Sequence, residues 1–217
     1  DTIIIASVAC IYGASNPEQY RDMFFSIRVG DIIDRKELMG KLVARQYQRN
    51  EMDLIRGTFR VRGDVIEVAL GHTDSYILRI EMFDDEIERI CEVDPLTGKV
   101  QNAYTVYVVY PASGYATKQE IINRAADTIG AELEERLKEL DNEGKLLEKQ
   151  RLEQRTRYDM EALREFGVCP GIENYSRHID GRKPGERPYT LFDYFPDDFL
   201  LVVDESHVSL PQIRGMY

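Results

Sequence analysis

The stretch "GTFRVRGDVIEV", residues 57–68, decides the fold class, because here the periodicity of the sequence changes to two. Phe59 and Val61 alternate with Arg60 and Arg62, so a strand of these residues has one apolar face and one basic face. Strands of this kind are typical of antiparallel sheets that pack one face on a core. The stretch therefore predicts a strand whose arginines point away from the core.

The segments that follow continue this alternation. "YILRIEMFDDEIERICEVD", residues 76–94, predicts strands with an apolar and a charged face. The inward residues are Leu78, Ile80 and Met82, and the outward ones are Arg79 and Glu81. "DPLTGK", residues 94–99, predicts a turn, and "AYTVYVVYPAS", residues 103–113, predicts one further strand. Residues 57–113 thus predict a small α+β module on an antiparallel sheet.

Helical patterns lie on both sides of this module. Before it, Asn16 and Pro17 predict the start of a short helix, and residues 35–48 predict a second one. The residues expected to face inward, or to lie near the end of that second helix, are Leu38, Leu42, Val43 and Tyr47. These patterns predict a helical lead-in to the sheet.

A longer helical pair is predicted after the module. Thr117 and Glu120 have the spacing of a capping box, Asn142 and Gly144 interrupt the pattern, and Gly167 is a C-cap candidate. The inward residues are Ile122, Ala125, Ile129, Leu133, Leu137 and Leu140. The dense charges between them are most simply solvated helix faces. Residues 169–195 then read as a long polar, aromatic and basic loop.

The composition limits the partners of the chain. Its 217 residues carry a net charge of −11, which excludes a general affinity for nucleic acid and leaves only local contacts. Three widely spaced cysteines without a C-x-x-C pair favour free thiols in a reducing compartment over a zinc site. The sequence shows no signal peptide or membrane span, so we expect a cytoplasmic protein without membrane contact.

The two ends of the chain carry apolar runs. "TIIIASVACIYG", residues 2–13, predicts a strand over residues 2–8, closed by Gly13. In "FLLVVDESHV", residues 199–208, five apolar residues precede two carboxylates, as in a buried parallel strand that ends at a ligand-binding edge. A strand followed by an acidic turn is the alternative. Because both ends look cut, we expect a piece of a longer chain.

Several motifs in fixed order give the chain a family resemblance. They are "ASVACIYG", "RGTFRVRGDVIEV", "EMFDDEIERICEVDPLTGK", "KLLEKQRLEQRTRYDMEAL", "GIENYSRH" and "TLFDYFPDDFLLVVDESHVSLPQIRGMY". Together they resemble the UvrB family of excinuclease subunits, which verify damage in bacterial nucleotide excision repair. The resemblance covers essentially the whole chain.

The resemblance implies a multidomain α/β and α+β fold. A UvrA-interaction module over residues 23–115 and a helical subdomain over residues 116–195 would be inserted into a partial RecA-like parallel sheet of the superfamily-2 helicase type. Residues 1–22 and 196–217 would supply that sheet. In the family, the complete protein also binds ATP and Mg²⁺ and interacts with UvrC and damaged DNA.

The resemblance also implies site residues. "VVDESH" is similar to a DExH box, in which Asp204 would serve Mg²⁺, Glu205 would polarise the attacking water, and His207 would couple the γ-phosphate to DNA. The phosphate cradle G-x-x-x-x-G-K-[ST] occurs nowhere in the sequence. We therefore expect half an ATPase site, no bound nucleotide and no ATP hydrolysis by this chain.

Two further sets of residues are implied as interaction sites. The UvrA contacts would be Arg49, Arg60, Arg62, Arg79 and Glu81, for which a solvated sheet face is the alternative. The DNA contacts would be Tyr115, Arg155, Tyr175, Arg177 and His178, for which core aromatics and helix-surface arginines are the alternative. Two other functions stay open: a transcription-repair coupling factor, and a non-enzymatic interaction module with a decayed acidic motif.

Overall fold

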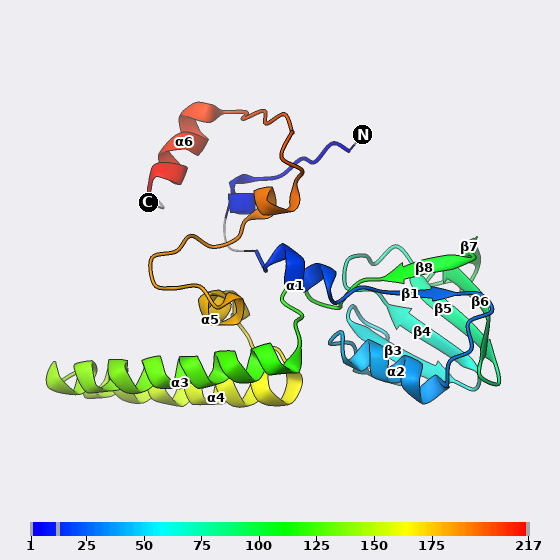
Figure 1. Cartoon of the computed structure of the whole chain (residues 1–217), viewed down its shortest axis with the longest axis horizontal. Helices are drawn as coiled ribbons and strands as arrows, with labels where there is room; N and C mark the ends of the chain where they lie inside the picture. Colours follow the sequence, from blue (N-terminus) through cyan, green and yellow to red (C-terminus); the bar gives the residue numbers. More distant parts are fainter. Residues whose placement is uncertain (1, 12–13, 216–217) are drawn as a thin grey trace.

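The computed structural model describes residues 2–11 and 14–215, which form three parts (Figure 1). A sheet-bearing module lies at one end and a pair of long helices at the other. The segments near the two ends of the chain form the third part and lie together: Ala14 pairs with Tyr189, and the Ser15 carbonyl accepts a hydrogen bond from the Tyr194 hydroxyl at 2.9 Å.

A six-stranded sheet in the order β2-β3-β4-β5-β6-β7 forms the body of the module. Its strands are β2 (Gln48–Arg49), β3 (Thr58–Arg62), β4 (Val65–Ala69), β5 (Ile77–Phe83), β6 (Glu86–Val93) and β7 (Val100–Tyr104). Neighbours run antiparallel except β2 and β3, which are parallel. The predicted antiparallel α+β module is confirmed.

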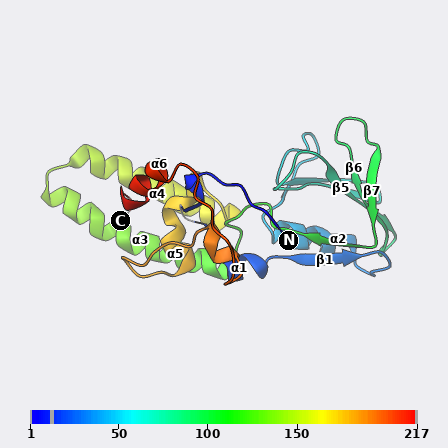
Figure 2. The same ribbon diagram turned by 90° about the horizontal axis from the view of Figure 1, so that it is seen from above.

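The single strand predicted over residues 103–113 is wrong, because the chain bends at Thr105. β7 ends just before the bend, and β8 (Val106–Val109) then pairs with β1 (Phe25–Arg28) in a separate two-stranded sheet. This bend lets β8 leave the larger sheet. Together with α2 (Arg35–Val43), the small sheet covers one face of the larger one (Figure 2).

The core of the module lies between that face, α2 and the small sheet. Its fully buried side chains include Leu38, Leu42, Tyr47, Phe59, Ile66, Leu78, Ile80 and Ile90. Met82 is 5% exposed and Val61 is partly buried against the same cluster, so the predicted inward face of β3 and β5 is confirmed. The pattern of alternating residues therefore located the core of the sheet correctly.

The helix predicted over residues 35–48 is shorter in the structure and ends at Val43, whose side chain is exposed rather than inward. Gln46 adopts a left-handed conformation with φ of 66°, which no α-helix can continue. The turn brings Tyr47 back into the core, where its hydroxyl donates to the Tyr110 carbonyl at 2.9 Å. The predicted short helix is confirmed as α1 (Pro17–Arg21), with Asn16 as its N-cap.

The helical pair consists of α3 (Gln119–Asn142) and α4 (Leu146–Phe166). All of the inward residues predicted on α3 are buried, and Gly167 ends α4 with φ of 71°, as expected for a C-cap. The predicted capping box is wrong. Lys118 occupies the N-cap and makes no side-chain cap bond, and the Thr117 hydroxyl donates to Gln19 Oε1 at 3.4 Å rather than capping the helix.

The long loop predicted over residues 169–195 contains short helices that pack on the helical pair or join the end segments. They are η2 (Ile172–Tyr175), α5 (Ser176–Asp180) and η3 (Leu191–Tyr194). Ile172 and Ile179 are buried against α3 and α4. Gly181 ends α5 with φ of 72°. The segment is thus ordered: η2 and α5 belong to the helical subdomain, whereas η3 belongs to the end segments.

The strands predicted over residues 2–8 and 199–203 are not formed. Residues 2–7 have no regular structure, Val8–Ile11 form a 3-10 helix (η1), and residues 200–203 are irregular. Ile3, Ile5, Leu200 and Val202 are 78–96% exposed. A strand needs a neighbour to pair its backbone groups, and no other described segment pairs with either run. The predicted turn at Gly13 lies outside the described residues.

The fold class is therefore confirmed at the level of a sheet module plus a helical subdomain. The described residues contain no parallel RecA-like sheet. Within residues 2–11 and 14–215, no helix combines the length and apolar character that a membrane span requires.

Candidate functional site

The outer face of the six-stranded sheet carries the arginines expected to bind a partner. Arg60 on β3, Glu67 on β4 and Arg79 on β5 are direct cross-strand partners. Strand pleating places all three side chains on the face opposite the core. The sheet thus assembles an arginine–glutamate–arginine row from three strands.

Glu67 divides its carboxylate between the two arginines. Oε2 accepts from Arg60 Nε at 2.6 Å, and Oε1 accepts from Arg79 Nη2 at 2.8 Å and Nε at 3.2 Å. The Glu67 side chain is 7% exposed, against 19% and 25% for Arg60 and Arg79. Burial alone raises the pKa of Glu67, but the hydrogen bonds from the two guanidinium groups outweigh it and lower the pKa. The carboxylate is ionised and fixed at neutral pH.

A second charged row lies next to the first. Arg62, Val65 and Glu81 are cross-strand partners, and Glu81 lies opposite Arg89 on β6 at 3.8 Å. Arg62 is exposed and makes no ion pair within the described part of the chain. This row therefore offers an exposed guanidinium group beside the fixed pair.

Arg49 lies at the edge of the same sheet, on β2. Its Nε donates to Glu51 Oε1 at 2.6 Å, and its side chain is 54% exposed. Hydrogen bonding to Arg49 lowers the pKa of Glu51, whose side chain is 44% exposed. The five predicted partner-binding residues thus share one sheet, although Arg60 and Arg79 are half-buried and already paired.

An apolar patch adjoins the charged rows on the outer face. Ala69, Ile77, Cys91 and Val93 cluster there, and Leu54 packs over them. Cys91 is fully buried, and burial raises the pKa of its thiol. The patch closes one end of the face, so the arginines lie at the border between covered and open sheet.

A cleft on the helical subdomain collects most of the residues predicted to contact DNA. Its volume is ≈ 390 Å³, and Arg155, Tyr175 and His178 line it together with Glu132, Arg136 and Asn174. The Tyr175 hydroxyl donates to the buried Asp159 at 2.7 Å, while Arg155 lies 3.9 Å from the same carboxylate and is 71% exposed. Burial and the bond to Asp159 raise the pKa of Tyr175 to about 12.

Arg177 and His178 form one network beside this cleft. Arg177 pairs with Glu132, and His178 Nδ1 lies 2.9 Å from the Thr128 hydroxyl, which donates to the Ala125 carbonyl. Nδ1 therefore donates to Thr128, while Nε2 lies 3.2 Å from Arg177 Nη2, which can donate to it, and 3.1 Å from Glu132 Oε2. Burial and the neighbouring Arg177 lower the pKa of His178 to about 4, so the ring is neutral at pH 7.

Tyr115 is not among the side chains that line the cleft. It precedes α3 and is half-buried, and burial and the Asp180 carboxylate raise the pKa of its hydroxyl. Three of the five residues predicted to bind DNA thus line the cleft, Arg177 adjoins it through Glu132 and His178, and Tyr115 packs against the same hydrophobic cluster as Tyr175.

The acidic motif lies at the start of α6 (Ser206–Gly215). Asp204 accepts a hydrogen bond from the Glu205 amide at 2.9 Å, and His207 Nδ1 lies 3.3 Å from Glu205 Oε2. All three side chains are exposed, and the described residues contain no group of three or more His, Cys, Asp or Glu that could hold a metal ion.

Comparison with known proteins decides the family. A family model described as "UvrB interaction domain" matches residues 25–115, and one described as "UvrB third helical domain" matches residues 120–181. The whole chain is 58% identical to "UvrABC system protein B" of Geobacillus kaustophilus, 59% to that of Bacillus caldotenax and 57% to that of Bacillus subtilis. The chain belongs to the UvrB family. It spans 33% of the length of each of these relatives.

The matched UvrB interaction domain contains both charged rows, and the matched third helical domain contains the cleft. Several residues of these sites were not predicted from the sequence, and Glu67, Glu132 and Asp159 make the most contacts among them. For Glu67 a signal existed, because it lies between the inward Ile66 and Val68 and must therefore point outward. For the other two, helical periodicity gave no sign of their partners.

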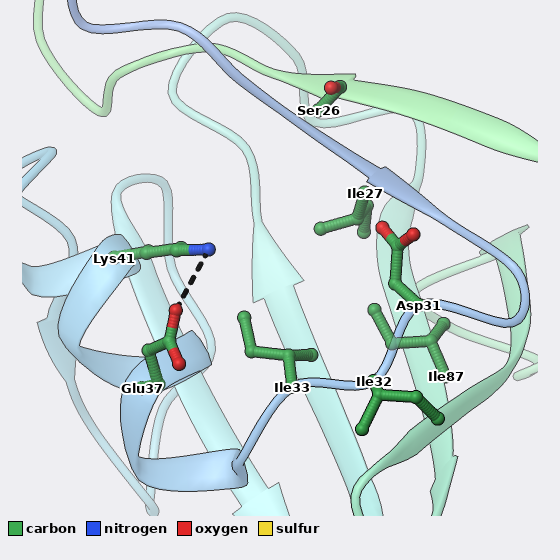
Figure 3. A pocket seen from close by; sticks show the side chains of 8 residues that line it. All are labelled: Ser26, Ile27, Asp31, Ile32, Ile33, Glu37, Lys41 and Ile87. Atoms are coloured by element: carbon green, nitrogen blue, oxygen red, sulfur yellow. Dashed lines mark ion pairs between the residues drawn. The ribbon is translucent and has the colours of Figure 1, made fainter.

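A small cavity of ≈ 190 Å³ opens on the other side of the module, beside α2 (Figure 3). Its floor is apolar, with Ile27, Ile33 and Ile87, and an ion pair of 3.1 Å between Lys41 and Glu37 lies at its rim. None of the predicted site residues lines this cavity, so it belongs neither to the arginine face of the sheet nor to the cleft of the helical subdomain.

Proposed function

We propose that this chain is the UvrA-docking and DNA-facing part of a UvrB protein, and that it acts in nucleotide excision repair in the cytoplasm. The observation that carries the proposal is the arginine face of the interaction domain. In a chain with a net charge of −11, arginines outnumber carboxylates across β3, β4 and β5. Three arginines against two carboxylates give these strands a local excess of positive charge, which favours an acidic partner surface through electrostatic complementarity.

The structure changes which arginine tests this proposal. The alternation had predicted Arg60 and Arg62 to be equally exposed, so that charge reversal at both would leave folding intact. Arg60 is instead paired with the buried Glu67, and a glutamate at position 60 would place two carboxylates together. Arg62 remains the exposed position.

The proposal is tested by calorimetric titration of UvrA with the chain, and again with Arg62→Glu. We expect binding by the wild type and at least tenfold weaker binding by the variant, since desolvated charge pairs at interfaces contribute about 2–5 kcal/mol. If the wild type gave no heat of binding at concentrations up to about 100 μM, the proposed docking function would be wrong.

The cleft of the helical subdomain supports a second function, local contact with DNA. Arg155 is its most exposed cation, and Tyr175 and His178 supply rings on which bases can stack. The overall negative charge predicts weak binding, near the weak end of the nonspecific range of about 10⁻⁴–10⁻⁶ M at physiological salt. Fluorescence anisotropy with duplex and single-stranded DNA, comparing wild type with Arg155→Ala, measures it.

The acidic motif supports a place beside a nucleotide site of the complete protein rather than a site of its own. We propose that residues 2–8 and 199–203 become strands of a helicase-like sheet when neighbouring strands are available, which their apolar composition and high exposure support. That complete protein would bind ATP and Mg²⁺ and would interact with UvrC. The chain itself is expected to hydrolyse no ATP, and steady-state turnover above that of Glu205→Gln would contradict this.

The two rival functions differ in measurable ways. A coupling-factor identity is disfavoured by "GIENYSRH" and the helical segment, which lie in the matched third helical domain. A purely non-enzymatic module would show no magnesium–nucleotide binding even within a full-length protein that contains this chain.

A further inference from the structure

In the row Arg60–Glu67–Arg79, both guanidinium groups are held by hydrogen bonds to the single carboxylate of Glu67. Each arginine uses the Nε side of its fork on Glu67: Arg60 contacts Oε2 with Nε and Nη2, both at 2.6 Å, and Arg79 contacts Oε1. Neither Nη1 group donates to another residue in the described part of the chain. Both forks are therefore held by one edge and free at the other.

We propose that Glu67 is a positioning residue of the docking face: it fixes the two guanidinium groups side by side so that their free Nη1 edges meet carboxylates of the partner. This inference rests on the proposed UvrA-docking function. It concerns how that face is built, not whether it docks.

Burial makes Glu67 suitable for this role. A carboxylate that is 7% exposed is screened little by solvent, so it restrains its partners more strongly than a surface glutamate does. An arginine side chain carries about 2 kcal/mol of rotamer entropy, part of which is lost on docking unless the side chain is already ordered. Two arginines held in advance lose less of this freedom when the partner binds.

Net charge and positioning give opposite expectations, which makes the inference testable. Removing the negative charge of Glu67 makes the face more positive, so charge alone predicts tighter binding to an acidic surface. Loss of positioning predicts weaker binding. The sign of the change therefore separates the two.

The experiment uses two variants of the whole chain in calorimetric titrations with UvrA. Glu67→Gln keeps the shape of the side chain and loses the charge, while Glu67→Asp keeps the charge and is too short to reach both arginines. The matched control is Glu88→Gln, an exposed glutamate of β6 that loses the same charge. We expect both Glu67 variants to bind at least tenfold more weakly than wild type, and the control to bind within about twofold.

A structural readout accompanies the titrations and needs no partner. In ¹⁵N-labelled protein, the Nε–Hε signals of Arg60 and Arg79 should move to the positions and fast solvent exchange of free arginine in both Glu67 variants, while backbone amide signals of β3, β4 and β5 stay in place. If Glu67→Gln fails to fold, Glu67→Asp carries the test.

Unchanged or tighter binding by a folded Glu67 variant would overturn the inference, as would arginine signals that do not move. These outcomes differ from failure of the docking function itself, in which the wild type does not bind UvrA or Arg62→Glu binds as well as wild type.

Discussion

The sheet face and the helical pair both carry many arginine–carboxylate pairs, yet the pairs differ in burial. On the sheet, Glu67 is 7% exposed and joins two arginines. On the helices, Arg157 is 51% exposed and bonds to Glu134 and Glu153, whose side chains are 55% and 39% exposed. Exposed pairs contribute about 0–1 kcal/mol, whereas removal of one partner of a buried pair is strongly destabilising. Similar contacts therefore hold the side chains in fixed positions on the sheet, whereas on the helices they are solvent-exposed pairs that contribute little to stability.

The largest expected effect compares a core side chain of β3 with an exposed side chain of the helical pair. Phe59→Ala removes a side chain that is 1% exposed and should lower the free energy of unfolding by about 3–5 kcal/mol. Tyr158→Ala on α4 removes an aromatic ring that is 65% exposed and should change it by less than about 0.5 kcal/mol. Urea unfolding followed by circular dichroism measures both, and equal losses would show that Phe59 does not lie in the core of the module.

A smaller effect compares the two kinds of ion pair. Glu67→Ala leaves two half-buried guanidinium groups without their carboxylate and should cost about 2–3 kcal/mol, below the range for fully buried pairs because both arginines keep some solvent contact. Glu134→Ala is the control on the helical pair and should cost less than about 1 kcal/mol. If the two variants unfolded alike, burial would not distinguish the regions.

The pH dependence of stability should separate the regions further. The pKa of His178 falls from 6.5 to about 4 on folding, so its neutral form stabilises the folded state fully above pH 6.5, and this contribution is lost as the pH falls towards 4. Between pH 7 and pH 5 the loss is about 2 kcal/mol from this shift, with Arg177 opposing the charged ring and Glu132 favouring it.

The contribution of Glu67 to stability changes only at a pH below the range in which His178 titrates. The pKa of Glu67 is lowered from 4.5, so its contribution persists throughout pH 5–7 and is lost only in more acidic solution. Unfolding at pH 7 and pH 5, for wild type and His178→Gln, measures the difference. The variant should have lost the part of the pH dependence that comes from His178 and should keep the part from His72, whose pKa burial also lowers. A wild-type slope in the variant would assign the whole dependence to other groups.

The sequence predicted the two faces of the sheet and the buried stripe of α3, because both follow from local periodicity. It did not predict the pairing of Glu67, since that depends on the register between β3, β4 and β5. Nor did it predict the bend at Thr105 or the loss of the Thr117 cap, which depend on contacts between distant segments, such as Thr117 with Gln19.

The end segments also show what local sequence could not predict, because here a strand-like composition did not give a strand. Residues 199–203 have the composition of a buried strand, but Leu200 is 89% exposed. Composition indicates what a segment can pair with, and only a neighbouring strand decides whether it does. The residues of the acidic motif were therefore recognised by type, while their geometry was not.

The central claim, that the sheet face rather than the helical surface docks the partner, is tested most directly by matched charge reversals. Arg62→Glu and Arg157→Glu change the net charge equally at exposed positions in the two regions. In calorimetric titrations of UvrA, with melts confirming that both variants are folded, we predict at least tenfold weaker binding for Arg62→Glu and wild-type affinity for Arg157→Glu. Equal affinities for the two variants, or a loss only for Arg157→Glu, would contradict the account.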